Sequence, residues 1–321
     1  KIAVLDAADA RAADTWMEYL TAALAGRAPD YLVISHMEPD HSAGIARLAA
    51  AYPEMRLVGN ARTFTILRQF FSDLGPERFC EVKEGGELAL GAHTLRFYLA
   101  PMVHWPEVMV SYETTEKLLF SADAFGTFGP GGMLAGADSA AWAPEARRYY
   151  CNIVGKYGVQ VQALLKKLAG LEIRAVCPLH GPVLAGDLAP FLSWYDTWSS
   201  YRPEAPEEVL LACASIHGHT KAAAARLAEM LRARGAAVTE LDLTRTDVSY
   251  AVAEAFRCGR LVLACATYDG GLFPPMEAFL AHLKSRGWQN RRVALMENGS
   301  WAPMAARQMR AQLEGMKDVS V

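Results

Sequence analysis

The stretch His36-Met37-Glu38-Pro39-Asp40-His41 follows directly on the apolar run Tyr31–Ser35, which predicts a buried strand. In extended chain, alternate side chains point to one side, so His36, Glu38 and Asp40 can converge there. Pro39 keeps the residue before it extended. Two imidazoles and two carboxylates exceed what one structural zinc ion needs, and the mixture indicates half of a two-metal site. The alternative is a polar loop that caps a helix starting near Ser42.

Three later positions repeat this layout of a strand-like run followed by a potential ligand. The runs 95–100, 117–121 and 173–177 lead to His104, Asp123 and His180. Ligands from the ends of several strands can meet at one edge of a sheet, where many active sites are built. A single histidine after a strand is usually structural, but three such candidates beside the first motif indicate one metal site. The expected ligands are His36, Glu38, Asp40, His41, His104, Asp123 and His180, and no catalytic side chain is expected beyond them.

The order His-x-Glu-x-Asp-His, then a distant His, Asp and His, resembles the metallo-β-lactamase superfamily. Glu38 stands where that superfamily usually has the second histidine of His-x-His-x-Asp-His. Together with the stretches Val103–Glu107 and Ser121–Gly126, this replacement looks like the flavodiiron proteins, also called A-type flavoproteins. The chemistry agrees, because a carboxylate in place of an imidazole makes the site harder and more anionic. Such a site favours iron that cycles between ferrous and ferric over redox-silent zinc.

The second half of the chain contains a candidate phosphate loop. A short apolar strand, Val209–Ala214, leads into Ser215-Ile216-His217-Gly218-His219-Thr220, and a helical pattern follows from 221 to 234. A loop of small and hydroxyl residues at a helix N-terminus can hold a phosphate. The loop resembles the flavodoxin pattern Ser/Thr-x-x-Gly-Asn-Thr, with His219 at the usual Asn position. No Gly-x-Gly-x-x-Gly pattern and no Walker lysine is present, which argues against a dinucleotide or a nucleoside triphosphate.

Two further loops fit a flavin. Both follow predicted strands, at 261–266 and 293–296, and ligands of open parallel sheets bind beyond the carboxyl ends of the strands. An aromatic side chain there could contact the isoalloxazine ring, and the glycines allow close approach of the backbone. The alternative is that these are ordinary turns between strand and helix. The expected residues are Thr267, Tyr268, Asp269, Gly270 and Gly271 in the first loop, and Asn298, Gly299, Ser300 and Trp301 in the second.

Composition and charge exclude several classes of binding partner. The 321-residue chain has a net charge of −3 and no basic stripe, so neither nucleic acid nor an anionic membrane is an expected partner. No uninterrupted apolar run approaches the ~20 residues of a membrane span. The six cysteines form no Cys-x-x-Cys pair. We therefore expect reduced thiols in a cytoplasmic protein that has no iron–sulfur cluster and no fused rubredoxin.

A polar, proline-bearing stretch at 199–208 predicts a linker between two domains. Residues 1–203 mix strands and helices as in an αββα sandwich of the metallo-β-lactamase type. Residues 207–321 alternate strand and helix as in a flavodoxin-like doubly wound parallel sheet. Both ends look cut, so we expect the family's first strands to precede Lys1 and its last strand and helix to follow Val321.

The resemblance implies a flavodiiron oxidoreductase that reduces dioxygen to water, nitric oxide to nitrous oxide, or both. By the same resemblance, His36, Glu38 and His104 hold one iron, Asp40, His41 and His180 hold the other, and Asp123 bridges them. It also implies FMN, an external and rubredoxin-like electron donor, and a head-to-tail homodimer or a dimer of dimers. Trp105 and Glu107 are candidates for a supporting or proton-handling role.

Two other readings remain open on the sequence. One is a two-zinc hydrolase of the metallo-β-lactamase type with an attached flavodoxin-like domain, against which Glu38 and the flavin loops argue. The other is an electron-transfer module whose metal site is only structural. An open site with several carboxylates is poorly suited to that role, because structural zinc is normally closed and tetrahedral.

Overall fold

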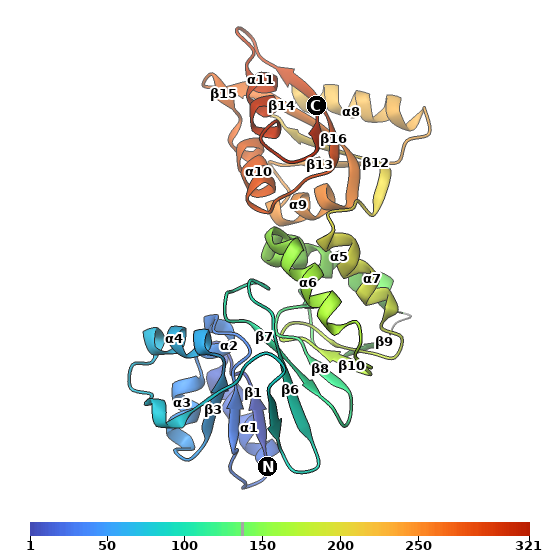
Figure 1. The fold of residues 1–321 in the computed structure, drawn as a ribbon. Helices are drawn as coiled ribbons and strands as arrows, with labels where there is room; N and C mark the ends of the chain where they lie inside the picture. Colours follow the sequence, from blue (N-terminus) through green and yellow to red (C-terminus); the bar gives the residue numbers. More distant parts are fainter. Residues whose placement is uncertain (136–137) are drawn as a thin grey trace. The chain divides into compact units, whose positions relative to one another are not determined.

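The computed structural model describes residues 1–135 and 138–321, which form two compact units (Figure 1). The first unit contains Lys1–Ser139 and Ala163–Pro190, and the second contains Ala140–Gln162 and Phe191–Val321. The chain therefore enters each unit twice. The domain boundary at 203–207 stays a prediction about sequence segments. In the described ranges, no helix combines the length and the apolar character needed to cross a membrane.

The first sheet of the first unit is parallel, and its strands follow the order of the chain. Its outer face packs against helices through a buried cluster that includes Leu32, Leu48 and Leu67. The strands are β1 (Ala3–Leu5), β2 (Tyr31–Val33), β3 (Arg56–Gly59) and β4 (Phe79–Glu81), and the helices are α1 (Ala13–Leu24), α2 (Pro39–Ser42), α3 (Ile45–Ala51), α4 (Ala61–Phe70) and the 3₁₀ turn η1 (Pro76–Arg78).

The second sheet of this unit is mixed and has the order β5-β6-β7-β8-β10-β11-β9. Its strands are β5 (Glu87–Ala89), β6 (Thr94–Leu99), β7 (Met109–Glu113), β8 (Leu118–Phe120), β9 (Met133–Ala135), β10 (Ala175–Cys177) and β11 (Val183–Ala185). Val33 and Val58 of the first sheet pack with Leu95, Phe97 and Met109 of the second. Two sheets thus face each other across a common core, which confirms the expected metallo-β-lactamase-like sandwich.

A group of helices follows β9 and contributes to both units. These helices are α5 (Ser139–Tyr149), the π-helical turn η3 (Tyr150–Val154), the 3₁₀ turn η4 (Gly155–Tyr157), α6 (Gly158–Leu168) and α7 (Ala189–Ser199). In the first unit, Lys167 near the end of α6 donates a hydrogen bond to the carbonyl of Leu99 in β6 (2.6 Å). In the second unit, the buried Arg147 of α5 forms ion pairs with Glu204 (2.6 Å) and Glu254 (3.1 Å). Residues of this helical group therefore belong to both units.

The third sheet is parallel and has the order β13-β12-β14-β16-β17. Its strands are β12 (Ala205–Ala214), β13 (Val238–Asp242), β14 (Cys258–Tyr268), β16 (Arg291–Asn298) and β17 (Val319–Ser320), and the short β15 (Gly271–Leu272) pairs with the end of β14. Helices α8 (His219–Arg232), α9 (Val248–Arg257), α10 (Pro274–Ser285) and α11 (Ala305–Leu313) connect the strands. Helix α8 packs on the face of Val209 and Leu211, and α9 and α10 lie on the opposite face (Figure 1). This is the expected flavodoxin-like arrangement.

Candidate metal centre and flavin pocket

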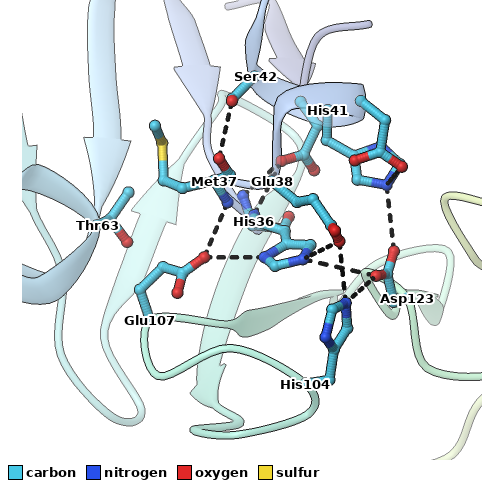
Figure 2. Close-up of polar contacts among 12 residues, drawn as sticks. His36, Met37, Glu38, His41, Ser42, Thr63, His104, Glu107 and Asp123 are labelled. Atoms are coloured by element: carbon cyan, nitrogen blue, oxygen red, sulfur yellow. Dashed lines mark hydrogen bonds and ion pairs between the residues drawn. The ribbon is translucent and has the colours of Figure 1, made fainter. Parts of the chain in front are cut away.

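The first group of predicted ligands lies on the loop and helical turn that follow β2 (Figure 2). Glu38 has extended backbone angles (φ −59°, ψ 141°), as expected for a residue that precedes a proline. Pro39, however, begins the helix α2, because proline is well suited to the first helical turn. Asp40 and His41 therefore project from a helical turn, and the expected alternation along extended chain ends at Glu38.

The three later ligand candidates follow strands that run in one direction. His104 follows β6, Asp123 follows β8 and His180 follows β10. Both β6 and β8 are antiparallel to β7, and β10 is parallel to β8, so these three strands end at the same edge of the second sheet. The structure brings all three side chains to the loop that follows β2, as the sequence predicts.

Four side chains form the first ligand group, with ligand atoms that all lie within 4.8 Å of one another: His36, Glu38, His104 and Asp123. Glu38 Oε2 lies 3.3 Å from His36 Nε2 and 3.0 Å from His104 Nε2. Asp123 Oδ2 lies 3.1 Å from His104 Nε2 and 3.6 Å from His36 Nε2. Figure 2 shows these atoms pointing toward a common centre. Two imidazoles and two carboxylates are thus available to one metal ion.

Asp40, His41 and His180 form the second ligand group. His41 Nε2 lies 2.9 Å from His180 Nε2, and Asp40 Oδ2 lies 3.2 Å from each of these nitrogens. The other oxygen of Asp123, Oδ1, lies 3.2 Å from His41 Nε2 and 3.6 Å from His180 Nε2. Asp123 therefore presents one oxygen to each group, which is the arrangement of a bridging carboxylate.

Electrostatics at this site favour positive charge. Burial alone would lower the pKa of His36, but hydrogen bonds to Glu107 and Glu38 raise it to about 10. Hydrogen bonds from His104 and His36 lower the pKa of Glu38 to about 2. Burial opposes ionisation of Asp123, yet hydrogen bonds from His104 and His41 hold its pKa well below the usual range. The carboxylates are therefore ionised and ready to bind cations.

Two observations show that this residue set fits metal ions. Asp40 Oδ1 is buried and has no hydrogen-bond partner among the described residues. His41 and His180 also direct the same type of ring nitrogen at each other across 2.9 Å. A buried oxygen without a donor is costly, and two ring nitrogens that converge on the same carboxylates can share a cation with them. The mixture of imidazole and carboxylate suits iron better than a structural zinc ion.

Two buried carboxylates support the loop without belonging to either ligand group. Glu107 Oε1 accepts hydrogen bonds from His36 Nδ1 (2.8 Å) and from the Met37 N–H (2.9 Å). Asp6 Oδ1 accepts from the backbone N–H of Ser35 (2.7 Å) and of His36 (3.2 Å). The sequence singled out Glu107 but not Asp6. The only sequence signal for Asp6 is its place directly after the apolar run at 2–5, the same layout that marks the ligands.

The predicted phosphate loop and the two predicted flavin loops surround a cavity of about 270 Å³ in the second unit. Its lining residues are Ser215, Ile216, His217, His219, Thr220, Ala266, Thr267, Asn298, Gly299 and Ser300. Ile216 and Ala266 were not predicted. Of the remaining predicted residues, Gly218, Tyr268, Asp269, Gly270, Gly271 and Trp301 are not among its lining residues. Tyr268 is 44% exposed and Trp301 is 83% exposed, so neither aromatic ring is a core residue.

The start of helix α8 provides the polar groups of this cavity. Ser215 Oγ accepts a hydrogen bond from the Gly218 N–H (3.1 Å), which closes the loop. Gly218 has φ +87°, a conformation that favours glycine, and no side chain caps the helix that begins at His219. The N–H groups of the first turn are therefore free to bind an anion. Thr220 Oγ1 lies 3.4 Å from Asn298 Nδ2, which links this loop to the end of β16.

A family model described as "ODP family beta lactamase" matches residues 1–181, more than half of the chain. The chain belongs to this family. The ODP-family chain is 28% identical over 249 residues to a diflavin flavoprotein A 1 of Synechocystis, a match that covers 77% of this chain and 43% of the relative. It is 25% identical over 321 residues to an anaerobic nitric oxide reductase flavorubredoxin of Aeromonas hydrophila, covering 98% and 64% of the two chains.

Among solved structures, rubredoxin oxygen:oxidoreductase from Desulfovibrio gigas matches this ODP-family chain with a TM-score of 0.92 and 25% identity. The match covers 99% of this chain and 80% of that one. These relatives confirm the resemblance to the flavodiiron proteins. The chain spans less than half the length of the diflavin flavoproteins that it matches.

Proposed function

We propose that this chain is the flavodiiron part of an oxidoreductase that reduces dioxygen to water, nitric oxide to nitrous oxide, or both. The observation that carries the proposal is the pair of ligand groups joined by Asp123, with Glu38 as an oxygen ligand in the first group. The names of the relatives support both gases, since one is an oxygen oxidoreductase and another a nitric oxide reductase.

The ligand groups suggest how two iron ions are held. His36, Glu38 and His104 would bind one iron, and Asp40, His41 and His180 would bind the other, with Asp123 shared between the two groups. The position of His41 supports its inclusion, because its Nε2 lies 3.2 Å from both Asp40 and Asp123. Two ferrous ions and one reduced FMN together supply the four electrons that reduction of dioxygen to water requires.

The cavity beside α8 is the proposed FMN site. Ser215, Thr220 and the free N–H groups at the start of α8 suit a phosphate, because oxyanions bind well at helix N-termini. The loop residues 267–271 and 298–301 lie at the ends of β14 and β16, where a flavin ring is expected in this type of sheet. The proposed metal ligands fall within 1–203 and the proposed flavin loops within 207–321. The first segment would therefore hold the irons and the second the FMN.

Metal and flavin analysis of the purified protein tests this proposal. Protein from an iron-supplied host should contain about two irons and one FMN per chain, and acid should release the flavin. Two zinc ions without flavin would instead identify a hydrolase of the metallo-β-lactamase type and refute the redox proposal. One tetrahedral zinc, resistant to chelators, would indicate a structural site.

Partners and location are also proposals. An external, rubredoxin-like donor would reduce the flavin, in line with the rubredoxin in the names of two relatives. A cytoplasmic location suits the six free cysteines. A head-to-tail homodimer, or a dimer of such dimers, would place the FMN of one subunit beside the diiron site of the other.

Mixing two inactive variants tests the dimer. His104→Ala should lack an intact metal site, and Thr220→Ala, purified without added FMN, should be depleted of FMN. Heterodimers formed after dissociation and reassociation should regain part of the activity through one intact pair of sites. A fully active monomer in sedimentation would show that electrons pass within one chain, and the dimer proposal would then be wrong.

A further inference from the structure

Glu107 binds His36 on the side of the imidazole ring that faces away from the other ligands (Figure 2). The side chains of both residues are 0% exposed, and Glu107 Oε1 lies 2.8 Å from His36 Nδ1. The remaining ring nitrogen, Nε2, points toward Glu38 and Asp123. Glu107 is thus placed to act on the metal site through His36 while contacting no metal position itself.

The hydrogen bond to Glu107 determines which form of the imidazole can bind metal. An ionised carboxylate only accepts hydrogen bonds, so His36 Nδ1 must carry the hydrogen. A neutral imidazole carries one ring hydrogen, so its Nε2 then has a free lone pair. That lone pair is what a metal ion requires of a histidine ligand.

Glu107 is itself held firmly. Its backbone carbonyl accepts a hydrogen bond from Asn60 Nδ2 (2.6 Å), and the Asn60 side chain caps helix α4. Its Oε1 also accepts from the Met37 N–H, while Asp6 accepts from the two preceding N–H groups. The backbone on both sides of His36 is therefore fixed by buried carboxylates. A ring held this way has little freedom to turn.

We propose that Glu107 is the positioning residue of the first ligand group, setting its metal affinity by fixing the orientation and ring hydrogen of His36. This inference rests on the proposed two-metal site. It also predicts an asymmetry, because no such bond from Glu107 reaches Asp40, His41 or His180 among the hydrogen bonds of the described residues. Loss of Glu107 should weaken one metal position and spare the other.

The test is a Co²⁺ titration of metal-free protein against a competing chelator, followed by optical absorption. The wild-type protein should bind two equivalents. Glu107→Gln keeps the size of the side chain but allows its amide to donate toward Nδ1, so it should bind one equivalent about tenfold to a hundredfold more weakly, with a changed spectrum. Glu107→Asp keeps the charge but withdraws the oxygen, and it should weaken the same equivalent.

Glu113→Gln is the matched control. Glu113 is also buried, lies in the first unit and accepts from a histidine Nδ1, that of His93 (3.2 Å), but it belongs to neither ligand group. It should leave both equivalents unchanged. Equal weakening of both equivalents, unchanged binding in Glu107→Gln, or the same effect in the control would overturn the positioning role. A wild-type protein that binds fewer than two equivalents would instead overturn the two-metal site.

Discussion

Removing the hydroxyl of Thr220 isolates one contact of the proposed phosphate site. Thr220 is 2% exposed and lies in the first turn of α8, where its Oγ1 is 3.4 Å from Asn298 Nδ2. Thr220→Val keeps the branched shape and deletes only the polar group. Asn298 is exposed, so its amide can turn to water and adds little cost of its own. The change therefore reports mainly on the hydrogen bond to phosphate.

A hydrogen bond to a charged group contributes about 1.5–3 kcal/mol, which corresponds to a loss of about tenfold to a hundredfold in FMN affinity. Quenching of flavin fluorescence on titration into flavin-free protein measures it. Riboflavin has the same ring but no phosphate, so its affinity should not change. Ser215→Ala should weaken FMN retention in the same way.

Thr244→Val is the matched control for this experiment. Thr244 lies in the same unit and its hydroxyl donates to Asp242 (2.6 Å), but it does not line the cavity. The control should bind FMN as the wild type does. Unchanged FMN affinity in Thr220→Val, or an equal loss for riboflavin, would show that the phosphate does not bind at Thr220.

Two further substitutions test the metal site and the packing of the second unit. Glu38→His should retain the fold but raise the zinc-to-iron ratio and lose most gas reduction, since imidazole stabilises ferric iron less than a carboxylate does; wild-type turnover would refute this. Arg147→Ala leaves the buried Glu204 and the partly buried Glu254 without their partner and should lower the free energy of unfolding by about 3–5 kcal/mol in urea titrations. Arg226→Ala removes an exposed ion pair and should cost about 0–1 kcal/mol, and equal losses would contradict the argument.

The proposed metal ligands could be located in the sequence because they follow strands within a few residues. A buried apolar run is visible in the sequence, and a polar residue that follows it is expected to lie at the edge of the sheet. The same reasoning identified the loops around the proposed FMN cavity. It did not predict that Tyr268 and Trp301 lie outside the lining of that cavity, because the exposure of these side chains depends on tertiary structure.

Other secondary-structure elements could not be predicted from the sequence alone. Strands β9 and β11 have three residues each and form only because neighbouring strands supply partners. Pro39 favours both an extended residue before it and a helix start, and tertiary structure selects the helix that carries His41.

The double passage of the chain through its two compact units has a consequence for how the protein is made. During synthesis, His180 is the last of the proposed metal ligands to leave the ribosome, and it lies in the segment Ala163–Pro190 between two parts of the second unit. The metal site therefore cannot form until helix α5 has already left the ribosome. At that point Glu204 and Glu254, which pair with Arg147 of α5, have not yet been synthesised. A chain that stopped at residue 203 would retain every metal ligand yet leave Arg147 without both carboxylates. The linker that divides the sequence is thus a poor place to cut the protein.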